Sequence, residues 1–285
     1  MTDMEGDPAR PRRAAVLGSP IAHSLSPVLH RAGYRDLGLE WRYDAIEVTQ
    51  ESLAAFVAGC GPEWAGLSLT MPLKRAVLPL LDTRAALVDV VGAANTVVFG
   101  AGGERAGHNT DVAGIVAALR GIDAAAGPAL VLGGGATAAS ALPALAELGC
   151  PEVAVVARRP EVARAALEGV ADRVGVALEV GSWPAPGARL PDADEATVVV
   201  VTAPAAASAS LADAVPARPG ALLDVSYEPW PPVLVRAWEA AGGRAAAGDE
   251  MLLHQAVAQV RLMTGRTPNA TAMRSALRAA IAARG

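Results

Sequence analysis

The sequence contains almost no lysine and very little asparagine. Lys74 is the single lysine among 24 basic residues, and the three asparagines are Asn95, Asn109 and Asn269. A coding genome that prefers arginine and alanine explains such a bias, so a rare residue type that persists indicates a requirement at its position. Lys74, Asn95 and Asn109 all fall in the stretch that ends beside Asp111. The composition therefore directs attention to residues 74–111.

Long hydrophobic runs are absent as well, although 52% of the residues are hydrophobic and the mean hydropathy is +0.32. Much of this content is alanine, and charges or prolines interrupt every stretch as long as a membrane span, which takes about 20 apolar residues. The first residues, MTDMEGDPARPRR, contain no apolar core of the kind that a signal peptide has. We therefore expect a soluble, cytoplasmic protein without a membrane partner.

The features of nucleic-acid-binding and metal-binding proteins are also missing. The net charge is -5 and the pI is about 5.4, whereas a nucleic-acid-binding domain usually has a basic face. Cys60 and Cys150 lie far apart without metal-ligand spacing, which favours ordinary reduced thiols. The four histidines form no HExxH or related pattern. We expect neither a bound metal nor a nucleic-acid partner.

The chain instead alternates short apolar runs with amphipathic stretches, which predicts an α/β fold with mostly parallel sheets. Its 285 residues allow one large domain or two medium ones. We expect strands at 41–48 and 65–72, and a hairpin whose turn is the glycine-rich segment 100–103. Thr49 is the expected N-cap of the helix after the first of these strands. From Glu250 onward the pattern is helical.

A glycine-rich turn follows one predicted buried strand and opens a predicted helix. The segment VLGGGATAA fits the pattern GxGxxA with Gly133, Gly135 and Ala138. Gly133 permits a tight turn, Gly135 lets a pyrophosphate approach the backbone, and Ala138 allows close packing of helix and strand. The helix N-terminus favours an anion. The pattern indicates a dinucleotide site, and the alternative is a strand–helix turn that binds nothing.

Two arginines follow the next predicted strand, about 20 residues beyond the glycines, where an NAD site often has an acidic residue. Arg158 and Arg159 stand there instead. Guanidinium groups suit a 2′-phosphate, so the pair favours NADP over NAD. The alternative is a solvated arginine pair.

The loop GSPIAHSLSP, residues 18–27, raises a separate question. Ser26 before Pro27 fits a helix N-cap followed by proline at the first helical position. Alternatively, Ser24 and Ser26 present their hydroxyl groups to a polar ligand. The loop by itself leaves both interpretations open.

Lys74 and Asp111 are candidates for a proton-transfer pair, because an amine can titrate and a guanidinium cannot. The alternative is a surface ion pair, or two solvated charges that never meet. Neutral hydrogen-bonding side chains accompany them in the sequence, and together they suit a polyhydroxylated small molecule. These side chains are Ser24, Ser26, Thr70, Asn95 and Gln255.

Several motifs occur in a fixed order along roughly residues 14–280. They are GSPIAHSLSP (18–27), SLTMPLK (68–74), AANTV (93–97), GHNTD (107–111), LGGGAT (132–137), DVSYEPWPP (224–232) and MLLHQA (251–256). This ordered set resembles the shikimate dehydrogenase family. The resemblance implies an oxidoreductase that reduces 3-dehydroshikimate to shikimate reversibly with NADP, in the pathway to chorismate and the aromatic amino acids.

The resemblance also implies a domain organisation. An N-terminal α/β substrate-binding domain is expected at 1–111, and a Rossmann-like NADP-binding domain at 112–248. C-terminal helices at 249–285 are expected to return to the substrate domain. Members of the family place the active site between the two domains, and we expect a monomer or a homodimer.

Roles for individual residues follow from the matching motif positions. The resemblance assigns Lys74 as the catalytic acid/base with Asp111 beside it, and Ser24 and Ser26 as the groups that hold the substrate carboxylate. Further substrate contacts implied by it are Thr70, Asn95, Asp111, Tyr227 and Gln255. The implied cofactor-binding residues are Gly133, Gly134, Gly135, Ala136, Thr137, Arg158 and Arg159, with Val225 and Gly248 near the nicotinamide.

Some positions depart from the family pattern, and most of them bear on cofactor preference. Ser68 stands where asparagine is frequent, Val112 and Glu250 stand where glycine is frequent, and Ala157 replaces the asparagine of an NRT-like segment. VTAP replaces NATS or NTTP. Two alternatives to the main interpretation are a paralogue that acts on quinate or aminoshikimate and a non-catalytic NADP-binding regulator.

Overall fold

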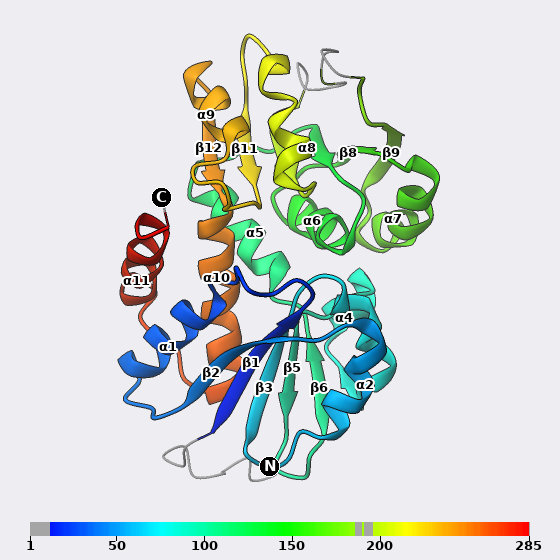
Figure 1. The fold of residues 1–285 in the computed structure, drawn as a ribbon. Coiled ribbons are helices and arrows are strands. Elements are labelled where there is room, and N and C mark those ends of the chain that lie inside the picture. The colour runs from blue at the N-terminus through cyan, green and yellow to red at the C-terminus, as the bar shows by residue number, and fades with distance from the viewer. Residues whose placement is uncertain (1–11, 186–189, 191–195, 285) are drawn as a thin grey trace. The chain divides into compact units, whose positions relative to one another are not determined.

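The computed structural model describes residues 12–185, 190 and 196–284 (Figure 1). The chain divides into two compact units, which are described separately below. Unit 1 comprises Met1–Thr110 and Leu253–Gly285, and unit 2 comprises Asp111–Leu252. Most of the N-terminal stretch that we predict not to be a signal peptide lies outside the described residues. Each unit contains one sheet flanked by helices, so the predicted α/β class is confirmed.

The sheet of unit 1 is mixed, with the strand order β2-β1-β3-β5-β6-β4. β1 lies parallel to both β2 and β3, whereas β5 runs antiparallel to β3 and to β6. The strands are β1 (Arg13–Gly18), β2 (Arg42–Glu47), β3 (Trp64–Leu69), β4 (Thr83–Arg84), β5 (Thr96–Phe99) and β6 (Arg105–His108). The predicted glycine-rich hairpin turn joins β5 to β6 and is confirmed.

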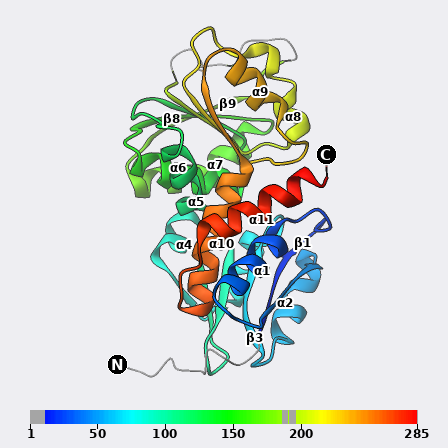
Figure 2. The same ribbon diagram turned by 90° about the vertical axis from the view of Figure 1, so that its left-hand side faces the viewer.

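Helices cover both faces of this sheet. Figure 1 shows α1, α10 and α11 on one side and α2 and α4 on the other, and Figure 2 shows α1 and α11 side by side. The helices are α1 (Ser26–Asp36), α2 (Gln50–Ala58), α3 (Leu73–Ala76), α4 (Ala86–Val91), α10 (Gly248–Thr264) and α11 (Ala270–Ala282), with a 3₁₀ turn η1 (Leu78–Leu80). α10 begins in unit 2 and continues into unit 1.

The two faces of β3 have different chemistry because successive side chains of a strand point to opposite sides. Leu67 and Leu69 join an apolar cluster with residues of α2, α3 and α4. On the opposite face, a Cβ atom at Gly66 would lie 2.9 Å from Met263 of α10, so glycine there permits close packing of the helix. Ser68 lies on that α10-facing side and is buried among polar groups.

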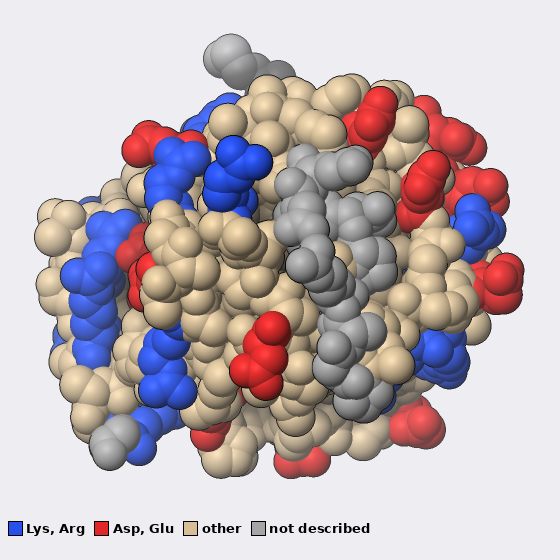
Figure 3. All heavy atoms as spheres, turned by 90° about the horizontal axis from the view of Figure 1, so that it is seen from above, with Lys and Arg blue, Asp and Glu red and all other residues tan. Residues whose placement is uncertain are grey.

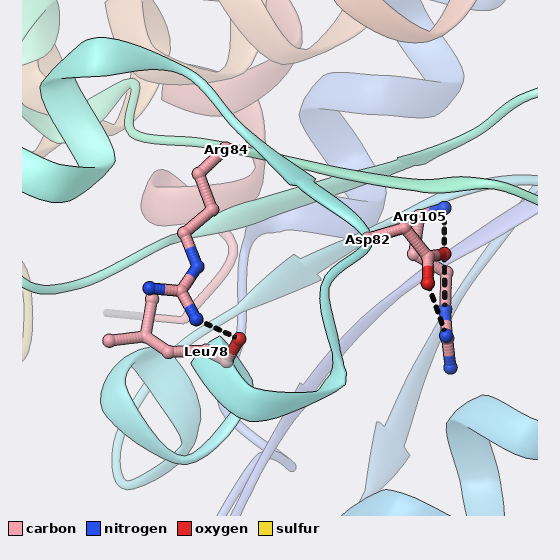
Figure 4. A network of polar contacts seen from close by, with 4 residues as sticks. All are labelled: Leu78, Asp82, Arg84 and Arg105. Carbon is pink, nitrogen blue, oxygen red and sulfur yellow. Dashed lines mark hydrogen bonds and ion pairs between the residues drawn. The ribbon is translucent and has the colours of Figure 1, made fainter.

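An ion pair joins the edge strand β4 to β6 (Figure 4). The Asp82 carboxylate accepts hydrogen bonds from the Arg105 backbone N–H at 2.8 Å, from Nε at 2.8 Å and from a terminal guanidinium nitrogen at 2.6 Å. These bonds hold the pKa of Asp82 at about 2. Nearby, the Arg84 guanidinium donates to the Leu78 carbonyl at 2.8 Å. The short edge strand therefore has polar anchors at both ends.

The sheet of unit 2 is entirely parallel, with the order β12-β11-β10-β7-β8-β9. Counted within the unit, the strand sequence reads 3-2-1-4-5-6 from the other edge, which is the order of the Rossmann fold. The strands are β7 (Ala129–Leu132), β8 (Glu152–Ala157), β9 (Ala177–Ser182), β10 (Val198–Val201), β11 (Ala221–Asp224) and β12 (Arg244–Ala247). The chain reverses its direction of winding between β7 and β10, where ligands of such sheets bind.

The central strands of unit 2 are apolar except for Asp224 at the end of β11, because helices bury both faces of the sheet. All residues of β7, β10 and β11 are buried. The helices of this unit are α5 (Asp111–Arg120), α6 (Ala136–Glu147), α7 (Pro160–Val174), α8 (Ala205–Ala209) and α9 (Val233–Ala240), with a 3₁₀ turn η2 (Ala212–Ala214). Trp238 of α9 is buried in the core, and its indole N–H donates to the Gly220 carbonyl at 2.9 Å.

Local expectations are partly confirmed. Thr49 is the N-cap of α2, and its backbone N–H donates to the Ser52 hydroxyl at 3.0 Å. The predicted strand 65–72 ends at Leu69, because the chain turns before Pro72. Ser26 is not an N-cap: it is the first residue of α1, and the N-cap is Leu25, whose side chain forms no capping hydrogen bond. The capping interpretation of Ser26 is therefore wrong.

The surface view in Figure 3 shows how charge is distributed on one face. Basic side chains gather mainly at the left of this view and acidic ones mainly at the right, each with a few of the opposite sign beside them, and uncharged residues lie between them. Within the described part of the chain, no helix is both long and apolar enough to cross a bilayer.

Candidate active site

The serine-containing loop after β1 is tied to the loop after β3 within unit 1. The backbone N–H of Ser19 donates to the Met71 carbonyl at 3.1 Å, and that of Thr70 donates to the Leu17 carbonyl at 2.9 Å. A Cβ at Gly18 would lie 2.4 Å from the Thr70 methyl group, so only glycine allows this approach. The structure therefore brings the predicted carboxylate loop beside Thr70.

The two predicted clamp serines form a local turn. The Ser24 hydroxyl accepts a hydrogen bond from the Ser26 backbone N–H at 3.3 Å. Ser26 is buried, while Ser24 is half-buried. The turn orients both residues at the start of α1, and the Ser24 hydroxyl keeps its proton for donation because it acts as acceptor in this bond.

Lys74 lies in the short helix α3, directly after the loop that contains Thr70. The Leu73 backbone N–H donates to the Thr70 carbonyl at 2.8 Å, and the Lys74 carbonyl accepts from Ala94 at 2.8 Å. Lys74 is half-buried. These backbone bonds fix Lys74 next to the segment that contains Asn95.

Asn95 is the centre of a buried hydrogen-bond network. Its side-chain oxygen accepts from the Thr110 backbone N–H at 2.8 Å and from the Thr96 hydroxyl at 2.9 Å. Its amide donates to the Thr110 hydroxyl at 2.9 Å and to the Gln255 side-chain oxygen at 3.4 Å. Only 1% of Asn95 is exposed. The structure thus joins Asn95 and Gln255, which lie far apart in the sequence.

Three further polar residues support this network, and one of them, Gln259, was not among the residues predicted from the sequence. The Asn109 amide donates to the Ala93 carbonyl at 3.0 Å, which fixes the chain on one side of Asn95. Gln259 of α10 donates to the Asn95 carbonyl at 3.2 Å, and Ser68 donates to Gln259 at 2.9 Å. The spacing of Gln259 four residues after Gln255 puts both on one face of a helix, and this was the signal available in the sequence.

The glycine turn of unit 2 has the geometry of a phosphate site. Gly133 has φ +121°, and a Cβ there would lie 2.5 Å from the Thr202 hydroxyl oxygen. A Cβ at Gly134 would lie 2.5 Å from that of Ala163. Around Gly135, in contrast, no heavy atom of the described residues outside its own turn lies within 4 Å of such a Cβ.

The turn therefore contains two glycines required by packing and a third that borders open space. Gly135 is the N-cap of α6 and has no side chain with which to cap the helix, which begins with Ala136 and Thr137. Backbone N–H groups at such a helix start attract a phosphate. This open cradle fits the pyrophosphate of a dinucleotide.

Arg158 and Arg159 follow β8, which lies beside β7 in the sheet. Both side chains are exposed, and neither forms a hydrogen bond or ion pair with another described residue. Because the strands are parallel, the arginines and the glycine turn both lie at the carboxyl ends of the strands. Two available guanidinium groups at these strand ends fit a 2′-phosphate.

The remaining cofactor candidates are Val225, which follows β11, and Gly248, which begins α10. A Cβ at Gly248 would lie 2.1 Å from the Val225 carbonyl oxygen, and its backbone N–H donates to Ser226 at 3.0 Å. The structure therefore brings Val225 and Gly248 together. Just before them, the buried Asp224 carboxylate accepts from the Ser226 hydroxyl at 2.6 Å, and burial raises its pKa.

The predicted substrate residues are divided between the two units. Asp111 begins α5 and is buried, and Tyr227 follows β11 and is half-buried; both belong to unit 2. Their predicted approach to the residues of unit 1 stays a prediction. Among the described residues, no group of three or more histidine, cysteine, aspartate or glutamate side chains has the arrangement of a metal site.

Two protein-family models match the chain. One, described as shikimate dehydrogenase substrate binding domain, matches residues 16–97, and one described as shikimate 5′-dehydrogenase C-terminal domain matches residues 248–278. The first match covers most of the sheet of unit 1, and the second covers α10 and most of α11.

Relatives and solved structures extend this likeness over almost the whole chain. Shikimate dehydrogenase (NADP(+)) of Methanothermobacter thermautotrophicus is 35% identical over 277 residues, which cover 92% of this chain and 94% of that protein. The crystal structure of Mycobacterium tuberculosis shikimate dehydrogenase has a TM-score of 0.84 and 46% identity, with 94% of this chain and 100% of that chain covered. The Thermus thermophilus enzyme in complex with NADP(H) and shikimate has a TM-score of 0.79 and 34% identity, with 94% and 99% covered. Likeness of this extent means that the chain belongs to the shikimate dehydrogenase family.

Proposed function

We propose that this chain interconverts 3-dehydroshikimate and shikimate with NADP, as an oxidoreductase that acts on a CH–OH group. The observation that carries this function is the likeness to shikimate dehydrogenases over more than nine-tenths of the chain. The reaction belongs to the route to chorismate and the aromatic amino acids. A cytoplasmic location and a monomeric or homodimeric state remain predictions from the sequence.

Unit 1 supplies most of the proposed substrate contacts. Neutral hydroxyl groups of Ser24 and Ser26 can donate to the substrate carboxylate, and the turn that links them supports this role. Asn95 and Gln255 present amide groups that are already oriented by one another, which suits recognition of substrate hydroxyls. Thr70 and, from unit 2, Tyr227 complete the proposed set.

Lys74 and Asp111 carry the proposed proton chemistry. NADP, when bound, supplies or accepts the hydride that interconverts ketone and alcohol. Lys74 donates a proton to the substrate oxygen during reduction and takes it back during oxidation, which an arginine at this position cannot do. Asp111 is proposed as the second member of the proton-transfer pair and as a contact of the substrate.

The cofactor residues of the proposal all belong to unit 2. Gly133, Gly134, Gly135, Ala136 and Thr137 form the phosphate-binding turn, and the open space at Gly135 supports this assignment. The exposed guanidinium groups of Arg158 and Arg159 would hold the 2′-phosphate. Val225 and Gly248 would lie near the nicotinamide.

The test is a spectrophotometric assay of cofactor reduction with shikimate, quinate and aminoshikimate, each with NADP⁺ and with NAD⁺. We expect the highest kcat/KM for shikimate with NADP⁺. A preference for quinate or aminoshikimate would assign the chain to a paralogue with a different substrate. Tight NADP⁺ binding without turnover of any of the three alcohols would instead make it a regulator.

A further inference from the structure

Gln259, a residue outside the proposed binding set, is hydrogen-bonded at both ends of its side-chain amide. Its nitrogen donates to the Asn95 carbonyl at 3.2 Å and to the Thr96 hydroxyl at 2.9 Å. Its oxygen accepts from the Ser68 hydroxyl at 2.9 Å and lies 3.1 Å from His30 Nε2. Only 1% of Gln259 is exposed. The amide uses its two donor protons and its acceptor oxygen fully, so it has one orientation.

The chemistry of the partners fixes the direction of every bond around Gln259. A carbonyl such as that of Asn95 can only accept, so the NH₂ group of Gln259 must face it. The oxygen therefore faces His30, whose Nε2 must carry a proton. His30 Nδ1, buried and without a hydrogen-bond partner among the described residues, is then the unprotonated nitrogen. Burial lowers the pKa of His30 to about 3, which keeps this neutral form at ordinary pH.

The donor end of Gln259 reaches Asn95 by two routes. One is the direct bond to its backbone carbonyl. The other runs through Thr96, whose hydroxyl accepts from Gln259 and donates to the Asn95 side-chain oxygen at 2.9 Å. Gln255, one helical turn before Gln259 on α10, accepts from the Asn95 amide. Two glutamines on one helix face thus hold the backbone and the side chain of the same asparagine.

The acceptor end of Gln259 faces away from Asn95, into the core. Ser68, which stands opposite Thr96 in the β3–β5 pairing, donates to Gln259 and accepts from the Tyr43 hydroxyl at 2.6 Å. The Tyr43 ring stacks on His30 with centroids 3.9 Å apart. This end therefore anchors the amide in the core through Ser68 and His30, which lie outside the proposed substrate set.

We propose that Gln259 is a positioning residue that sets the orientation of the substrate-binding amides of Asn95 and Gln255. It contacts neither substrate nor cofactor and acts through Asn95, Thr96 and the turn of α10 that it shares with Gln255. The inference rests on the proposed assignment of Asn95 and Gln255 as substrate contacts. The inference explains why the side-chain amides of Asn95 and Gln255 have a single orientation.

The experiment compares three full-length variants by steady-state kinetics with shikimate and NADP⁺ and by thermal unfolding. Gln259→Met keeps the length of the side chain and removes all of its hydrogen bonds. Thr96→Val keeps the shape of the strand residue and removes only the hydroxyl relay to Asn95. Tyr43→Phe is the matched control, because it removes a buried hydrogen bond at the opposite end and keeps the stacked ring.

We expect the KM for shikimate to rise by roughly 3–30-fold in Gln259→Met and by about 2–10-fold in Thr96→Val, as one or two lost hydrogen bonds imply. The KM for NADP⁺ should change by less than about 2-fold in both, as expected for variants outside unit 2. Tyr43→Phe should lower the midpoint of thermal unfolding without changing the KM for shikimate.

Wild-type KM for shikimate in Thr96→Val overturns the inference, and that variant decides the matter if Gln259→Met does not fold. An equal rise in Tyr43→Phe also overturns it, because the effect would then follow stability rather than the contact with Asn95. A wild-type enzyme without shikimate turnover would overturn the proposed function and this inference together. Turnover in the wild type with unchanged KM in the variants would overturn this inference alone.

Discussion

The substrate residues of unit 1 and the cofactor residues of unit 2 differ in how they are held. Asn95 and Gln255 are 1% and 7% exposed and are bonded to other side chains, whereas Arg158 and Arg159 are exposed and have no partner among the described residues. Buried polar groups are costly unless every partner is present, so the unit 1 network is ordered by folding itself. The side chains of Arg158 and Arg159 have no such hydrogen bonds to order them when the chain folds.

This difference predicts different consequences of substitution. A change in the hydrogen bonds of Asn95, Thr96 or Gln255 alters both the stability of the fold and the binding of substrate, because the same hydrogen bonds serve both. A change in the exposed arginines of unit 2 alters cofactor binding alone.

Replacement of Lys74 should have the largest effect on turnover. Lys74→Ala removes the proposed acid/base, whose contribution is typically about 10²–10⁴-fold, and kcat should fall by that order. Lys74→Arg keeps the positive charge but cannot release its proton near neutral pH, so its kcat should fall steeply too. NADP⁺ affinity, measured by calorimetry, should stay close to that of the wild type in both.

A Lys74→Arg enzyme with nearly wild-type kcat would contradict this assignment. Proton transfer would then run through another group, and Asp111 would be the next candidate.

Replacement of the arginine pair should have the next largest effect. Arg158→Ala with Arg159→Ala should weaken NADP⁺ binding by roughly 10²-fold or more, because each charge-assisted hydrogen bond is worth about 1.5–3 kcal/mol. NAD⁺ lacks the 2′-phosphate and should bind almost unchanged. Arg244→Ala is the matched control, since this exposed arginine begins β12 at the opposite edge of the same sheet.

An unchanged ratio of NADP⁺ to NAD⁺ affinity in the double variant would show that the arginines are a solvated pair. Loss of NADP⁺ affinity in Arg244→Ala of the same size would show a general effect of surface charge instead.

Removal of the two clamp hydroxyls should have a moderate effect on substrate binding. Ser24→Ala with Ser26→Ala should raise the KM for shikimate by roughly 10²-fold, the lower end of what two lost hydrogen bonds to a charged carboxylate imply. Ser19→Ala is the control from the same loop, because its hydroxyl donates to Glu47 at 3.0 Å. The clamp is excluded if the folded double variant keeps the KM of the wild type or of Ser19→Ala.

Removal of the Asp82–Arg105 ion pair should have the smallest effect, and it should change only the stability of the fold. The pKa of Asp82 in the folded protein, about 2, lies below its ordinary value of 3.8. The pair therefore stabilises the fold fully at pH values above 3.8. This contribution is lost as the pH falls through about 2. Exposed ion pairs stabilise little, so Arg105→Ala should lower the unfolding midpoint slightly near neutral pH.

The measurement is thermal unfolding of the wild type and Arg105→Ala at several pH values. The difference between their midpoints should shrink below about pH 4 and vanish near pH 2. A constant difference across this range would mean that Arg105 stabilises the fold through packing rather than through Asp82.

The sequence alone predicts those strands and turns whose local pattern of apolar residues or glycines is strong. The all-apolar runs of β7 and β10 and the glycine turn between β7 and α6 predict a parallel sheet with a nucleotide site. β9 and β12 were not predicted. β9, with the sequence ALEVGS, has no buried residue, and β12, with the sequence RAAA, lacks the branched residues typical of strands.

The site was predictable only where motifs are contiguous. Lys74 and the serine loop lie in short ordered motifs, whereas the bonds from Gln259 to Ser68 and Thr96 join residues 191 and 163 positions apart. No local pattern encodes such contacts, since they arise when α10 packs on β3 and β5. The Ser26 cap was mispredicted because one residue decides where α1 begins, and Leu25 occupies that position.

The division of binding between the units can be tested most directly by calorimetric titration of shikimate and of NADP⁺ into two proteins, Ser24→Ala/Ser26→Ala and Arg158→Ala/Arg159→Ala. We predict that the serine variant loses affinity for shikimate and keeps that for NADP⁺, and that the arginine variant does the reverse. A variant that loses both ligands, or a pair of variants that keep both, would contradict the account.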